Sequence, residues 1–129
     1  MASQSTDDQY RHFSSSPRSY LNKLRHRAKD RAAMVTLDEL LEIWKRQGGL
    51  CALSGFPLSH ELKKGVRNPY NASLDRIRPG QPYTKDNIQI VCSVLNPMRM
   101  DLSIGQFREL ICAVAAKFDE PERIRFESK

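Results

Sequence analysis

Two helix-start motifs enclose a central segment without helical periodicity, and they constrain the fold of this chain more than any other feature. Thr36 with Glu39, and Ser103 with Gln106, have the spacing of a capping box, in which two side chains bond each other's backbone amides. Apolar residues at helical spacing follow each motif. Short apolar pieces and turn-forming residues fill the segment between the end of the first of these helices and the second motif. The pattern predicts an α+β fold.

Three helices are expected. The first spans residues 17–34, with Ser16 as its cap and Pro17 in its first position. The second opens after Thr36 and ends at the glycine pair 48–49. The third opens after Ser103 and is stopped by residues 119–121. Its apolar spacing predicts an inward face made of Ile104, Phe107, Leu110, Ile111, Val114 and Phe118.

The central segment is expected to hold two strands and a short helix. Residues 72–77 alternate in polarity and residues 87–91 form a β-branched run, so both are predicted strands. Residues 78–86, between them, are rich in turn formers and are predicted to be a loop. A short helix is expected within residues 92–100, although Pro97 lies inside it.

The length of 129 residues fits one domain. We expect that domain at residues 17–120, between a Ser-rich disordered tail over 1–16 and a second tail over 121–129. No apolar run approaches ~18 residues, and the first eight residues lack the features of a secretory signal. Three scattered cysteines do not suit a disulfide framework, so a cytoplasmic location is expected.

The net charge of +6 is concentrated near the start of the chain. Residues 11–35 contain seven Lys or Arg and one Asp, which accounts for the whole excess. A concentrated basic stretch attracts a polyanion, because each neutralised phosphate releases counterions. A solvated basic helix without a partner is the alternative. The candidate nucleic-acid-binding residues of this stretch are Arg18, Lys23, Arg25, Arg27 and Arg31.

The order of motifs in the second half resembles the HNH nuclease family, and in particular its small bacteriophage proteins. The resemblance covers roughly residues 17–110. It is carried by Trp-Lys-Arg-Gln-Gly-Gly at 44–49, Cys-Ala-Leu-Ser-Gly-Phe-Pro-Leu at 51–58, Ser-Leu-Asp-Arg-Ile at 73–77, Tyr-Thr-Lys-Asp-Asn at 83–87 and Val-Cys at 91–92, leading to Asn96 and Arg99. The resemblance implies a ββα-metal core with flanking helices. It also implies a metal-dependent endonuclease that nicks or cleaves double-stranded DNA in a bacterial or phage-infected cell.

The resemblance also implies roles for individual residues. Asp75 and Asn96 would be the ligands of one divalent cation, Mg²⁺ or a similar ion such as Mn²⁺, because hard cations take oxygen ligands. Asn87 matches the family position whose amide fixes the loop and orients the neighbouring general base. Arg99 matches a basic position suited to gripping the scissile phosphate. Each residue also has a purely structural interpretation. Asp75 could form an ion pair at a strand edge, Asn87 could be a turn residue, and Asn96 could be a turn or helix-cap residue.

The chain departs from the family at the general base, where Arg76 replaces the usual histidine. A guanidinium stays protonated and does not accept a proton. Three interpretations follow. In the first, cleavage is retained, with Arg76 stabilising charge and with water activated by the metal or by another group, for which Tyr83, His60 and the substrate phosphate are candidates. In the second, Arg76 belongs to a variant subgroup in which Arg replaces His, and in the third the fold is retained without cleavage, as a DNA-binding or regulatory module. A third candidate function is a protein–protein adaptor whose basic helix contacts an acidic partner. We expect His60 on a surface loop and Tyr83 packed in its own loop.

The cysteines do not match the zinc-binding pairs of some HNH relatives. Cys51 is followed three positions later by Ser54, and Cys92 by Leu95, so the four soft ligands are missing and no structural zinc is predicted. Cys51 and Cys92 are instead expected to approach each other as buried thiols, and Cys112 to face a helix contact. One such site cuts one strand, so a homodimer is expected if the protein makes double-strand breaks. No membrane partner is expected.

Overall fold

An antiparallel hairpin lies at the centre of the computed structural model, which describes residues 17–28, 35–61, 65 and 67–119. Strand β1 (Ala72–Arg76) pairs with β2 (Ile88–Cys92), so that Ala72 faces Cys92 and Asp75 faces Gln89. A single 3-10 turn, η1 (Lys85–Asn87), precedes β2. Both predicted strands are confirmed, with Asn87 in the turn rather than in the strand. Together with the helices they confirm the α+β prediction.

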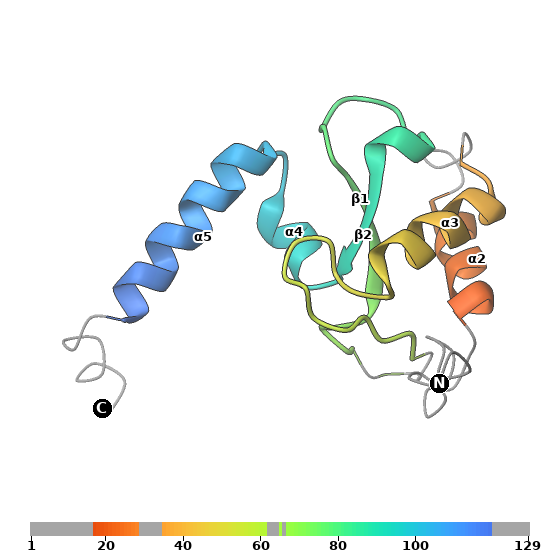
Figure 1. Cartoon of the computed structure of the whole chain (residues 1–129), viewed down its shortest axis with the longest axis horizontal. Helices are drawn as coiled ribbons and strands as arrows, with labels where there is room; N and C mark the ends of the chain where they lie inside the picture. The colour runs from red at the N-terminus through yellow and green to blue at the C-terminus, as the bar shows by residue number, and fades with distance from the viewer. Residues whose placement is uncertain (1–16, 29–34, 62–64, 66, 120–129) are drawn as a thin grey trace.

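Helices α2 (Pro17–Arg27) and α3 (Leu37–Gln47) pack against each other on one side of the hairpin (Figure 1). The capping box at Thr36 is formed as predicted, and α3 ends where Gly48 adopts the left-handed conformation that glycine tolerates. Helix α2 starts at Pro17 as expected and ends at Arg27. Residues 29–34, which the prediction included in this helix, lie outside the described residues.

The hydrophobic core lies between these helices and the hairpin. Tyr20 illustrates how the layers are joined, because its hydroxyl donates a hydrogen bond of 2.9 Å to the carbonyl of Ala72 at the start of β1. Burying such side chains is the main favourable term in folding. The principal buried apolar residues are Tyr20, Leu21, Val35, Leu40, Ile43, Trp44, Leu58, Leu74, Ile88, Ile90 and Val91.

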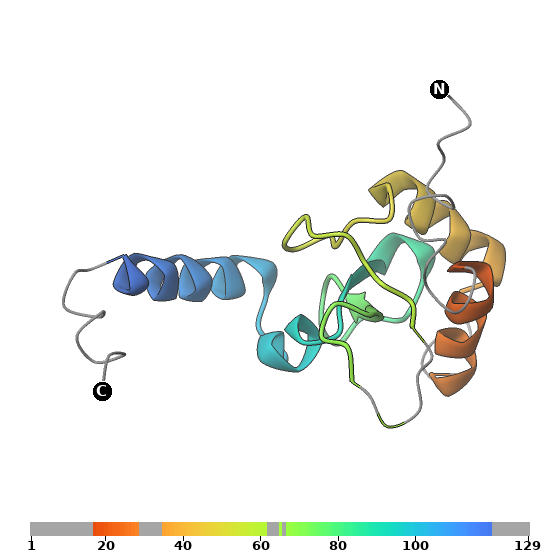
Figure 2. The ribbon, with the colours of Figure 1, turned by 90° about the horizontal axis from the view of Figure 1, so that it is seen from below.

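Helix α4 (Leu95–Arg99) packs against both strands of the hairpin, on the side away from α2 in both views (Figures 1 and 2). This five-residue helix confirms the short helix predicted within 92–100. Pro97 is tolerated because it lies in the first turn, where the backbone N–H has no partner within the helix. The hairpin therefore separates α4 from the basic helix α2.

Helix α5 (Ile104–Phe118) begins at the predicted capping box and extends away from the rest of the molecule (Figures 1 and 2). The prediction of a fully inward apolar face was wrong. Phe107 is buried, but the exposed fractions of Leu110, Val114 and Phe118 are 50%, 44% and 62%. The placement of Cys112 at a helix contact was also wrong, because this thiol is exposed. The spacing correctly indicated an amphipathic helix but could not supply the surface that covers it.

The two predicted tails, 1–16 and 121–129, fall outside the described residues. Within the ranges that the structure describes, none of the helices combines the length and apolar character needed to cross a bilayer.

Candidate functional site

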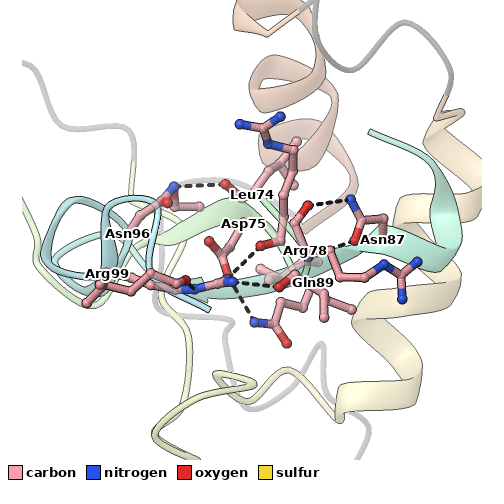
Figure 3. A network of polar contacts seen from close by, with 12 residues as sticks. Leu74, Asp75, Arg78, Asn87, Gln89, Asn96 and Arg99 are labelled. Carbon is pink, nitrogen blue, oxygen red and sulfur yellow. Dashed lines mark hydrogen bonds and ion pairs between the residues drawn. The ribbon is translucent and has the colours of Figure 1, made fainter. Parts of the chain in front are cut away.

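Asp75 lies at the centre of a polar network between β1, β2 and α4 (Figure 3). Its side chain is nearly buried, with 5% exposed. The Oδ2 atom accepts hydrogen bonds from the Arg99 guanidinium, with which it forms an ion pair, and from Gln89 Nε2 at 2.9 Å. Gln89 reaches it because the hairpin register places the two residues opposite each other. No hydrogen bond to Oδ1 is formed by the described residues, so this oxygen remains available to a ligand.

Arg99 is completely buried, and its guanidinium ties the end of α4 to the end of β1. Nη1 donates to the carbonyl of Arg76 and Nη2 to that of Ile77, both at 2.6 Å, while Nε donates to Leu102 at 3.0 Å. These partners and Asp75 satisfy a cation that would otherwise be costly to bury. The predicted contact with a scissile phosphate is not the role that this geometry supports, since the side chain has no exposed surface.

Asn96 is held directly beside the residue that precedes Asp75. Its Nδ2 donates to Ser73 Oγ at 2.9 Å and to the Leu74 carbonyl at 2.8 Å. Both bonds use the amide nitrogen, and among the described residues none donates to the amide oxygen. The side chain therefore docks α4 onto β1 and keeps one oxygen without a partner. Asn96, which the sequence places 21 positions after Asp75, is thereby bonded to the two residues that precede Asp75 in β1.

Asn87 fixes the loop between the strands, at the opposite end of the network from Asn96 (Figure 3). Its Oδ1 accepts from the Arg78 amide at 2.8 Å, and its Nδ2 donates to the carbonyls of Arg78 at 3.2 Å and Pro82 at 3.0 Å. Because both ends of the amide are used inside the loop, Asn87 acts on the loop backbone and not as a ligand. These bonds correspond to the loop-fixing part of the role that the resemblance implied, and the orientation of a general base stays a prediction.

Replacing Asn87 with Ala is expected to lower the free energy of unfolding by about 2–3 kcal/mol, because three backbone partners lose a buried side chain. Chemical denaturation monitored through Trp44 measures this change. The neighbouring exposed residue supplies the control, since Asp86→Ala should change stability by less than about 0.5 kcal/mol. Equal effects of the two substitutions would contradict the loop-fixing role.

Arg76 follows Asp75 but points toward the loop. Its guanidinium carbon lies 5.1 Å from the centre of the Tyr83 ring, and its Nη1 donates to the Gln81 carbonyl at 3.3 Å. Tyr83 thus packs within the loop as predicted, with the Arg76 guanidinium over its ring. Arg76 is partly exposed on the loop side, whereas the Asp75 carboxylate is held by Gln89 and Arg99 on the other face of the strand.

His60 is not on the surface as predicted, because only 1% of it is exposed. Its ring lies 6.1 Å from Trp44, edge to face, and 6.4 Å from Tyr20, measured between ring centres. The aromatic side chains of α2 and α3 cover this segment, which the local sequence could not indicate. A catalytic role for His60 would need access that this burial denies.

Cys51 and Cys92 approach each other as predicted. Cys51 Sγ accepts hydrogen bonds from the Cys92 amide at 3.3 Å and the Ser54 amide at 3.4 Å. Burial alone would raise the pKa of the Cys51 thiol, but the bonds from Ser54 and Cys92 outweigh it and leave the pKa lowered. The pKa of the Cys92 thiol is raised to about 11, first by burial and second by the neighbouring Cys51. The pair joins residues 51–54 to the end of β2.

The basic residues of α2 divide into two groups. Arg18, Lys23 and Arg27 are exposed, and no acidic residue occurs in the helix. Arg25 is partly buried, and its Nε donates to the carbonyl of Val35, the residue before the Thr36 cap, at 2.9 Å. Arg31 lies outside the described residues. Because α2 and α4 lie on different sides of the hairpin, the exposed charges do not line the Asp75–Asn96 site (Figure 1).

Two partners of Asp75 were not predicted from the sequence, namely Gln89 as a hydrogen-bond donor and Arg99 as the counter-ion. The register of the hairpin would have placed Gln89 opposite Asp75, but this register can be predicted only when the length of the loop between the strands is known. Among the described residues, no three His, Cys, Asp or Glu side chains gather as a metal-binding group, so the candidate cation site consists of one carboxylate and one amide.

Comparison with protein-family models, curated proteins and solved structures found no match for this chain.

Proposed function

We propose that β1, β2 and α4 form a ββα-metal core and that the protein is an endonuclease hydrolysing phosphodiester bonds in DNA. One observation carries the proposal. Asn96 from α4 is bonded to Leu74, the residue before Asp75, and neither the Asn96 amide oxygen nor the Oδ1 atom of Asp75 accepts a hydrogen bond from the described residues. Two separate elements thus supply two unused oxygens. Their order along the chain is the one in the HNH resemblance.

The donor chemistry suits a hard divalent cation such as Mg²⁺ or Mn²⁺. One anionic and one neutral oxygen leave most coordination positions to water and to substrate phosphate, which is how Mg²⁺ is commonly held. Such an ion neutralises charge on the phosphate and lowers the pKa of a bound water. Arg99 opposes this arrangement in part, because it shares the carboxylate of Asp75.

The remaining residues have supporting parts in this proposal. Gln89 and Arg99 hold the Asp75 carboxylate in one orientation, leaving Oδ1 as its open atom. Arg76, which lies over the Tyr83 ring, provides positive charge at the loop that follows β1. The exposed cations of α2 attract the DNA polyanion at long range, in a manner that weakens with salt.

A non-catalytic DNA-binding module is the second candidate, and two observations favour it. The charge of Asp75 is already neutralised by a buried guanidinium, and the next residue is an arginine, which cannot serve as a general base. In this case the network around Asp75 is structural, and only the basic surface acts on nucleic acid.

Nicking of supercoiled plasmid separates the two candidates. With Mg²⁺ or Mn²⁺ we expect the purified protein to produce relaxed circles, and we expect Asn96→Ala to reduce the rate at least roughly tenfold because it removes a ligand oxygen.

Ser73→Ala is the matched control, since it removes one partner of the same Asn96 amide but leaves the oxygen in place. Nicking by this variant should stay close to that of the unmodified protein. If the unmodified protein cuts no plasmid with either metal yet binds DNA in a salt-dependent manner, the endonuclease proposal is wrong and the binding module is supported.

A further inference from the structure

Helix α5 presents an apolar face that the described part of the molecule leaves uncovered. Leu110, Val114 and Phe118 follow one another at four-residue intervals on this face and are each at least two-fifths exposed. Phe107, one turn nearer the body, is already buried. The uncovered surface is therefore the outer part of a helix that extends away from the core (Figure 2). Exposed apolar groups gathered on one face mark an interaction site.

The spacing on this helix indicates another helix as the partner. Ile104, Phe107, Ile111, Val114 and Phe118 are separated by alternating steps of three and four residues. This repeat of 3.5 residues keeps one seam facing a neighbouring helix over two turns and more, as in coiled coils. Because Phe107 is already buried and Ile104 is partly buried, the free part of this seam runs from Ile111 to Phe118, about 10 Å along the helix, which is enough for a short contact.

The charge on α5 argues against strongly charged partners and suits a second copy of this helix. Residues 104–118 contain Arg108, Glu109 and Lys117 as their only charged side chains, a net of +1. Such a surface has no field to attract an acidic or basic peptide, a nucleic acid or an anionic lipid surface. A second α5 offers the same apolar seam with the same near-neutral flanks.

The size of the patch sets the strength of the contact. The exposed parts of Leu110, Val114 and Phe118, with the partly buried Ile111, amount to on the order of 400 Å² on each copy. Two such patches total about 800 Å², which is below the roughly 1,000 Å² of a stable specific interface and fits a weak dimer. We propose that the protein forms a homodimer through the apolar face of α5. This inference does not rest on the proposed function, although a dimer would bring two Asp75–Asn96 sites into one particle.

The test measures the mass of the full chain in solution by light scattering and sedimentation, at concentrations up to about 100 µM. We expect a dimer for the unmodified chain and a monomer for Val114→Glu, which places a charge on the seam. Ala116→Glu makes a similar change at an exposed position off the seam and should remain dimeric. Circular dichroism checks that each variant is folded.

Cys112 supplies an independent readout, because it is exposed on α5 whereas Cys51 and Cys92 are buried. A short bismaleimide should cross-link two copies, and Cys112→Ser or Val114→Glu should abolish the product. A monomer at about 100 µM, or a dimer that survives Val114→Glu, overturns the proposal. A monomer that Val114→Glu destabilises also overturns it, since residues 120–129 or another part of the same chain would then cover the face.

Discussion

Replacing Arg99 with Met should lower the free energy of unfolding by about 3–5 kcal/mol, because it leaves Asp75 as an unpaired buried charge. The guanidinium also satisfies three carbonyl groups, those of Arg76, Ile77 and Leu102, which would lose their donor. For a small domain this change removes a large part of the total stability. Urea denaturation followed by fluorescence and circular dichroism measures the effect.

Arg108→Met is the matched control for this prediction. Arg108 lies exposed on α5, so the same substitution there should change stability by less than about 0.5 kcal/mol. In the double variant Asp75→Asn/Arg99→Met no unpaired charge remains, and the coupling energy between the two sites should be about 1–3 kcal/mol. A cost below about 1 kcal/mol for Arg99→Met would show that the guanidinium is solvated, contrary to its burial here.

The sequence predicted well those elements whose signal is local. The capping boxes at Thr36 and Ser103 specify helix starts through bonds within four residues, and both formed as expected. Alternating and β-branched residues likewise predicted β1 and β2 to within about one residue. Such signals are carried by residues within one element, so they can be recognised without knowledge of the rest of the fold.

Features set by distant parts of the chain were predicted less well. The burial of His60 depends on Trp44 and Tyr20, which come from two other elements. The exposure of α5 is a matter of what packs beside it, and an apolar stripe alone does not contain that information. At the candidate site, the proximity of Asp75 and Asn96 was expected from the family order, whereas the ion pair with Arg99 depends on how α4 docks onto the hairpin.

The second prediction with a large expected effect concerns the nicking activity. Asp75→Asn should reduce metal-dependent nicking of plasmid by at least roughly 10²-fold, because the only anionic oxygen proposed for the cation becomes neutral. The same substitution also leaves the Arg99 charge buried without its partner, so stability falls as well. A loss of activity in this variant alone would therefore have two explanations.

The double variant Asp75→Asn/Arg99→Met distinguishes a ligand from a purely structural aspartate. Relative to Asp75→Asn it removes the unpaired charge, so stability should partly recover, while nicking should stay at least roughly 10²-fold below the unmodified protein. Both quantities are measured at a temperature where every variant is folded. If nicking returns together with stability, Asp75 acts only by pairing with Arg99, and the cation must be held elsewhere or not at all. If stability returns and nicking does not, the carboxylate is needed for the chemistry itself.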